Sequence, residues 1–201
     1  MWLMICGPTG SGKNVVAKEL VKTSFDYLPS FYVETEESKF IQELEILTSR
    51  VSAQMKASTL IDRRDIYTLR SFWDSKYVYI PAGKSFDRFS PMEAKALDIV
   101  CKSFDDDALT PPTAVIYCKT DKMNAHNRLA LQNRGVEISD EEFNLHVELY
   151  DKMIERVRVP VIEIDVSKDI AEIAKNLEFG LASLKSANLT NASVWSRTFF
   201  R

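Results

Sequence analysis

The sequence has few cysteines, few glycines and no excess of basic residues, and each shortage excludes a class of protein. Its 201 residues include only three cysteines, Cys6, Cys101 and Cys118, whose spacing forms neither a disulfide framework nor a zinc site. Six glycines and seven prolines exclude collagen-like and low-complexity chains. Lysine and arginine number 26 against 29 acidic residues, whereas nucleic-acid and anionic-membrane binders need a basic surface. We expect a cytoplasmic protein that binds no nucleic acid.

Long hydrophobic runs are also missing. The apolar residues 2–6 have no basic segment before them and stop at Gly7, and no other stretch approaches 18 apolar residues. We therefore expect no contact with a membrane. The length suits one domain, which we place at residues 1–187, followed by an irregular tail over residues 188–201.

Short apolar runs alternate with longer helical patterns, which is typical of a parallel α/β sheet. The apolar runs predict strands over Trp2–Cys6, Phe31–Val33, Leu60–Ile61, Ala114–Cys118 and Val159–Ile164. The patterns between them predict helices over Lys13–Lys22, Glu36–Lys56, Pro91–Phe104, Asn124–Asn133, Asp140–Arg156 and Asp169–Ser186. The fold class that follows is a five-stranded parallel sheet with helices on both faces.

A phosphate-binding loop follows the first strand. It consists of Gly7, Pro8, Thr9, Gly10, Ser11, Gly12 and Lys13, and a helical pattern follows it. The glycines let successive backbone N–H groups point inward at phosphate oxygens, and the helix N-terminus adds partial positive charge there. Lys13 supplies a point charge for the β- and γ-phosphates. The pattern predicts that ATP binds here, and a plain glycine-rich turn is the alternative.

Asn14 departs from the pattern of such loops, in which Ser or Thr follows the lysine and its hydroxyl ligates Mg²⁺. The amide oxygen of Asn14 is a hard, neutral ligand on a longer side chain. We therefore expect one of three outcomes: Asn14 holds the metal, the metal is held through water and a carboxylate, or turnover is weakened.

Acidic and basic residues follow two of the predicted strands. Glu34 follows the second, and Asp62 and Arg63 follow the third. The carboxyl ends of parallel strands are where α/β sheets bind ligands. A carboxylate there can accept a hydroxyl proton or bind Mg²⁺, and an arginine can neutralise a transferring phosphoryl group. Solvated surface charges are the alternative at both places.

Further arginines follow the fourth strand. Arg128 and Arg134 precede Gly135, where the chain can break and fold over the phosphates as a lid. Arginine suits this task because its planar fork clamps phosphate at two points. An ordinary charged helix end is the alternative. His126 and His146 lack metal-ligand spacing, and we expect both on helix surfaces.

Together these motifs resemble the deoxynucleoside kinases, the family of thymidine, deoxycytidine, deoxyadenosine and deoxyguanosine kinases. The resemblance is carried by the phosphate loop, Glu34, Asp62-Arg63 with Arg64 where the family has Ser, the segments Asp121–Glu137 and Phe143–Tyr150, and the last strand with Val159–Asp165. It spans nearly the whole chain in the expected order, although only the phosphate loop is a close match.

The resemblance implies a role for each matching residue. The loop glycines, Thr9, Ser11, Lys13 and Arg134 would hold ATP, and Asp62 and Asn14 would hold Mg²⁺. Glu34 would be the general base, and Arg63 and Arg128 would stabilise the transition state. Gln42, Phe72 and Glu137 would bind the nucleoside, with Glu43 as an equal alternative to Gln42 and core packing as the alternative for Phe72. Gln132 stands where a further lid arginine is expected.

The expected activity is transfer of the γ-phosphoryl group of ATP to the 5′-hydroxyl of a deoxynucleoside, a salvage reaction that supplies DNA synthesis, in a homodimeric protein. Two other functions stay open at this stage. A thymidylate-type monophosphate kinase would share the phosphate loop, the Asp-Arg pair and the arginine lid. A nucleotide-binding module with little activity would explain Asn14 and Gln132.

Overall fold

A computed structural model describes residues 1–30, 38–104, 109–132 and 138–190. Five parallel strands form one sheet in the order β2-β3-β1-β4-β5. The strands are β1 (Trp2–Cys6), β2 (Asp26–Tyr27), β3 (Ile66–Leu69), β4 (Ala114–Lys119) and β5 (Val161–Asp165). The predicted five-stranded parallel sheet is confirmed.

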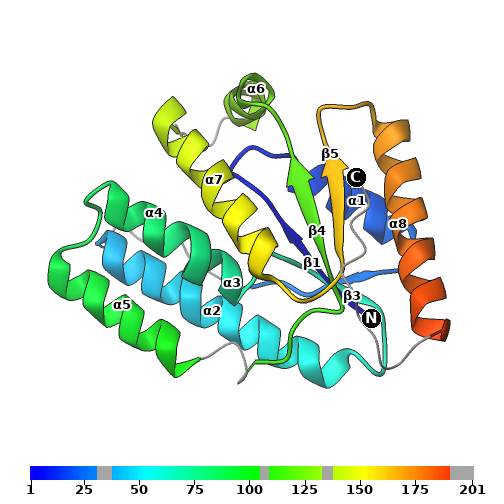
Figure 1. Ribbon diagram of the computed structural model, residues 1–201, viewed down its shortest axis with the longest axis horizontal. Helices are drawn as coiled ribbons and strands as arrows, with labels where there is room; N and C mark the ends of the chain where they lie inside the picture. Colours follow the sequence, from blue (N-terminus) through cyan, green and yellow to red (C-terminus); the bar gives the residue numbers. More distant parts are fainter. Residues whose placement is uncertain (31–37, 105–108, 133–137, 191–201) are drawn as a thin grey trace.

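Helices cover both faces of this sheet (Figure 1). On one side lie α2 (Lys39–Leu60), α3 (Phe72–Asp74), the π-helix η1 (Ser75–Tyr79), α4 (Ile80–Ser85), α5 (Pro91–Ser103) and α7 (Asp140–Arg156). On the other lie α1 (Lys13–Lys22) and α8 (Ile170–Thr190). The remaining helix, α6 (Lys122–Gln132), follows β4 and lies beyond its carboxyl end. We predicted that the last helix ends at Ser186 and that an irregular tail begins at residue 188, but α8 continues to Thr190.

The predicted third strand at Leu60–Ile61 is wrong. Leu60 is the last residue of α2. Ala57 is the last buried residue of this helix, and Ile61 continues the helical spacing of its buried residues. The third strand begins at Ile66, after a turn. The predicted second strand, Phe31–Val33, lies outside the described residues, and β2 comes earlier, at Asp26–Tyr27.

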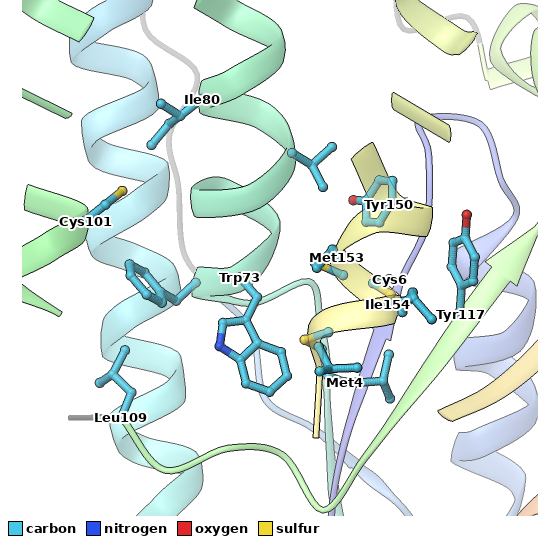
Figure 2. Close-up of a cluster of buried hydrophobic side chains, with 14 of the residues drawn as sticks. Met4, Cys6, Trp73, Ile80, Cys101, Leu109, Tyr117, Tyr150, Met153 and Ile154 are labelled. Atoms are coloured by element: carbon cyan, nitrogen blue, oxygen red, sulfur yellow. The ribbon is translucent and has the colours of Figure 1, made fainter. Parts of the chain in front are cut away.

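Two hydrophobic cores hold the layers together. The larger core packs β1 and β4 against α2, α3, α5 and α7; Figure 2 shows Met4, Trp73, Met153 and Tyr150 among its side chains. The second core packs the opposite face of the sheet against α1 and α8. Adjacent residues of a strand point to opposite faces, so Tyr117 enters the first core and Cys118 the second. Among the described helices, none is long and apolar enough to span a bilayer.

Candidate active site

The loop between β1 and α1 has a backbone that only glycine can adopt at two of its turns. Gly7 has φ 143°, and a Cβ atom there would lie 2.5 Å from the backbone oxygen of Cys118. Gly10 has φ 79°, and a Cβ atom would lie 2.7 Å from the backbone oxygen of Ala125. Positive φ is costly for residues with a side chain, and neither contact can be relieved by a side-chain rotation. The loop is therefore pressed against β4 and α6 in a shape suited to cradle phosphate.

Lys13 is folded back over this loop. Its ammonium donates hydrogen bonds to the carbonyls of Gly7 (2.7 Å) and Pro8 (2.6 Å) and to Oγ of Ser11 (3.2 Å). Burial, reinforced by the guanidinium of Arg70, lowers the pKa of Lys13 to about 7. The lysine thus lies in the concavity of the loop, where an anionic ligand would restore its charge.

This lowered pKa predicts that ATP binding depends on pH. Bound phosphates stabilise the ammonium and raise the pKa of Lys13 above about 7, so binding takes up a proton wherever the free lysine is neutral. We expect the affinity for ATP to fall as pH rises from 7 to 9, by up to about tenfold per pH unit. Titration calorimetry at pH 8 in two buffers of different ionisation enthalpy should show uptake of nearly one proton. An unchanged affinity over this range, without proton uptake, would contradict the expectation.

A cavity of about 630 Å³ opens in front of the loop. Its lining comprises residues 9–15 of the loop and α1, Tyr27 at the end of β2, Ser30 after it, Ile46, Ser49 and Arg50 on α2, Leu69 and Arg70 at the end of β3, and Arg128, Leu129 and Leu131 on α6. Four of these side chains are cationic: Lys13, Arg50, Arg70 and Arg128. The described part of the lining contains no carboxylate. Such a cavity favours an anionic ligand such as a nucleotide.

Arg128 lies where a phosphate ligand would meet it. Its guanidinium donates to the carbonyl of Gly10 (3.4 Å), to Oγ1 of Thr120 (3.0 Å) and to the carbonyl of Val166. These contacts join the loop, the end of β4 and the segment after β5. The sequence predicts Arg128 beside the phosphates, and in the structure its guanidinium contacts the phosphate loop.

Asp62 and Arg63 do not lie in this site. They occupy the exposed turn between α2 and β3, at the amino end of the sheet. The N-terminal ammonium of Met1 donates to the carbonyl of Ile61 in this turn (3.3 Å). The phosphate loop follows the other end of β1, about 17 Å away for five residues of strand. The prediction that Asp62 holds a metal and Arg63 stabilises transfer fails because it relied on the wrong third strand.

Arg70 occupies the place that we had assigned to Arg63. It follows Leu69, the last residue of β3, and its backbone N–H donates to the carbonyl of Ile5 in β1 (2.8 Å). Its φ of 69° is unusual for a residue with a side chain. Sequence reasoning missed Arg70 and Arg50, although the β-type run Ile66–Leu69 directly before Arg70 was a usable signal.

The predicted base-binding residues separate in the structure. Phe72 has no exposed surface and belongs to the larger core, where its ring meets that of Phe104 at 6.3 Å, so it does not line the cavity. Gln42 lies on α2 one turn before Ile46 and accepts a hydrogen bond from Lys39 (3.3 Å). Its alternative, Glu43, shares a face of the helix with Arg50, and the hydroxyl of Ser75 donates to its carboxylate. Burial raises the pKa of Glu43.

Three of the predicted site residues, Glu34, Arg134 and Glu137, lie outside the described residues. Their roles stay predictions from sequence.

His146 is buried on α7, which contradicts the surface position that we expected. Neither ring nitrogen has a hydrogen-bond partner. Burial lowers its pKa to about 4, and the charges of Arg70, Arg88 and Lys13 act in the same direction. His146 is therefore neutral near pH 7, where it packs edge-on against Tyr79 behind the cavity at 5.2 Å between ring centroids.

The described residues fit ATP better than they fit a protein-held Mg²⁺. Positive-φ turns, an enclosed lysine and the start of α1 suit a chain of phosphates. For a metal, the loop offers the exposed amide of Asn14 but no lining carboxylate among the residues whose positions are given, and Asp62 is at the wrong end of the sheet. The predicted Asp62 metal site is therefore not supported.

No family model and no curated protein matches this sequence. Solved structures do match its fold. One is deoxyadenosine kinase from M. mycoides with the products dCMP and a flexible dCDP bound, which matches with a TM-score of 0.70 and 16% identity over 92% of this chain and 100% of that chain. The same enzyme with bound dATP matches with a TM-score of 0.71 and 18% identity, over 90% of this chain and 100% of that chain. The resemblance to deoxynucleoside kinases is thus confirmed for the fold.

Proposed function

We propose that this protein transfers the γ-phosphoryl group of ATP to the 5′-hydroxyl of a deoxynucleoside. The observation that carries the proposal is a cavity that extends from the phosphate loop to a wall formed by α2 and the end of β3. ATP and the deoxynucleoside can both bind in this cavity and meet there. The ligands named for the structural neighbours, dCMP and dATP among them, support a nucleotide-sized occupant. A salvage role, a cytoplasmic location and a homodimer remain predictions.

In this proposal the cationic residues bind different parts of the two substrates. The loop and Lys13 hold the β- and γ-phosphates, and Arg128 binds at the loop beside Gly10. Arg70 lies between the two substrates, because it lines the cavity and its charge acts on Lys13. Charge on the transferring phosphoryl group is neutralised by Arg70 rather than by Arg63.

The general base would be Glu34. A carboxylate near the 5′-hydroxyl can take its proton as the phosphorus–oxygen bond forms. Glu34 follows Ser30, which lines the cavity, by four positions. Gln42 or Glu43 on α2, neither of which is among the described lining residues, would bind the nucleoside together with Glu137, and Arg134 would contact ATP.

The experiment is a panel of four deoxynucleosides and dTMP with radiolabelled ATP, run with the unaltered protein and with Glu34→Gln. We expect at least one deoxynucleoside to be phosphorylated and Glu34→Gln to lower that rate by at least about 10²-fold, the usual contribution of a general base. Glu36→Gln, which removes a nearby acid without an assigned role, serves as the matched control. If none of the four deoxynucleosides is phosphorylated, the proposal fails.

A monophosphate acceptor is the second candidate, and the charge of the cavity favours it. Arg50 and Arg70 face the acceptor side, and no carboxylate lines the described cavity. An acceptor that is already a phosphate needs arginines rather than a base. In that case dTMP alone would react in the panel, and Glu34→Gln would have only a mild effect.

A further inference from the structure

Tyr79 lies against both arginines of the acceptor wall. The guanidinium carbon of Arg70 is 4.6 Å from the centre of the Tyr79 ring, and that of Arg50 is 5.1 Å from it. Arg50 comes from α2 and Arg70 from the end of β3, so one aromatic ring joins two walls of the cavity. Both distances are within the range in which the face of a ring attracts a cation.

The ring itself is held from several sides. Tyr79 ends the π-helix η1, in which the N–H of Ile80 donates to the carbonyl of Ser75, and such turns are frequent at functional sites. Ser75 accepts a hydrogen bond from Nη1 of Arg50 (2.5 Å), so both ends of η1 contact this arginine. On α7, the hydroxyl of Tyr150 is 3.3 Å from that of Tyr79. The aromatic ring is therefore a rigid support rather than a loose surface side chain.

Arg70 is held mainly by charged and aromatic neighbours. Its Nε atom is buried and has no hydrogen-bond partner among the described residues, whereas Nη1 of Arg50 donates to Ser75. Burial lowers the pKa of Arg70, but Tyr79, Tyr150, Asp74 and Glu43 together raise it above its usual value. Contact with the aromatic face of Tyr79 restrains the guanidinium without using its N–H donors.

We propose that Tyr79 is a positioning residue, which holds the guanidinium of Arg70 toward the phosphoryl group that is transferred. The proposal rests on the proposed function, because it assigns Tyr79 a role in the same cavity. Tyr79 acts through Arg70 and does not itself react.

The test compares Tyr79→Phe, which keeps the ring, with Tyr79→Leu, which removes it. Tyr79→Leu is expected to lower kcat about tenfold, while the KM for ATP stays within about twofold because the phosphate loop is untouched. Tyr79→Phe should retain at least about half of the unaltered kcat. Tyr77→Leu is the matched control: Tyr77 lies on the same π-helix, and its ring contacts Lys76 (5.1 Å) and Arg156 (5.8 Å). Its kcat should stay unchanged.

A double-mutant cycle with Arg70→Gln shows whether the effect passes through the arginine. If it does, Tyr79→Leu will cost no more than about twofold in kcat once Arg70 is replaced. Additive losses in kcat, or a Tyr79→Phe variant as slow as Tyr79→Leu, would overturn the proposal.

The proposed function and the contact of Tyr79 with Arg70 are tested separately. If the unaltered protein phosphorylates nothing in the panel, the proposed function fails, and the same cycle is then measured by urea denaturation. Non-additive losses of stability would support the contact of Tyr79 with Arg70, and additive losses would overturn it.

Discussion

Replacing Lys13 by alanine is expected to lower kcat for phosphoryl transfer by about 10³-fold, which is the upper range for removing one preorganised donor at a developing charge. Lys13 is the cation inside the loop, and its three hydrogen bonds go to acceptors that surround the place of the phosphates. The measurement is steady-state transfer from labelled ATP, together with the Kd for ATP from calorimetry. We expect a weaker Kd as well, because ground-state binding also uses this charge.

Loss of folding should not explain that result. The pKa of Lys13 in the folded protein, about 7, is below its ordinary value of 10.5, so burial of its charge opposes folding. This penalty is complete below pH 7, decreases as the pH rises from about 7 to 10.5, and is absent above 10.5. The alanine variant should therefore stay folded at pH 6 to 7. Arg63→Ala is the matched control, since it removes a cation from the opposite end of the sheet and should leave kcat unchanged. Equal losses in both variants would contradict the assignment of the site.

Replacing Gly7 by alanine is expected to lower the free energy of unfolding by about 3 kcal/mol, near the upper end for a strained backbone position. Two effects act together. The backbone at φ 143° is unfavourable for alanine, and the added Cβ would lie 2.5 Å from the backbone oxygen of Cys118. Relief of this clash requires the loop to move away from β4, which should also abolish detectable ATP binding. Urea denaturation and ATP titration measure the two effects.

Gly180→Ala provides the comparison. A Cβ there would lie 2.8 Å from both Cδ1 and Cγ2 of the buried Ile162, and the residue is within α8. Overpacking of this kind costs roughly 1–3 kcal/mol, and alanine favours the helix by roughly 1 kcal/mol, which offsets part of it. We expect a loss of stability of at most about 2 kcal/mol and, because the contact is not in the phosphate loop, unaltered ATP binding. A Gly7→Ala variant that binds ATP normally would show that the loop shape is not required.

The phosphate loop was predictable because all of its determinants are local. Gly7, Gly10, Gly12 and Lys13 are within seven consecutive residues, between a strand and a helix whose bounds were both predicted correctly. Turn chemistry and a helix start depend on neighbours in the chain, so the sequence states them directly. The predicted bounds of α7 were also correct, because its apolar residues recur at helical spacing.

The acceptor wall was not predictable in the same way. Asp62-Arg63 follows the apolar pair Leu60-Ile61, and Arg70 follows the short run Ile66–Leu69. Only the packing of the chain shows which of the two ends a strand. Leu60 and Ile61 complete the buried face of α2, while Ile66 to Leu69 pair with β1 at the centre of the sheet. Short apolar runs do not distinguish a helix end from a strand, since both bury the same residue types.

By itself, the sequence determined the class of sheet, the phosphate loop and the lysine within it, since each depends on residues close together in the chain. Only the tertiary structure decided which cations share the cavity. Arg50, Arg70 and Arg128 come from three separate elements and meet because parallel strands end at one edge of the sheet. The contact of Tyr79 with two of them depends on the packing of η1 between α2 and α7. Packing of distant segments has no local sequence signal.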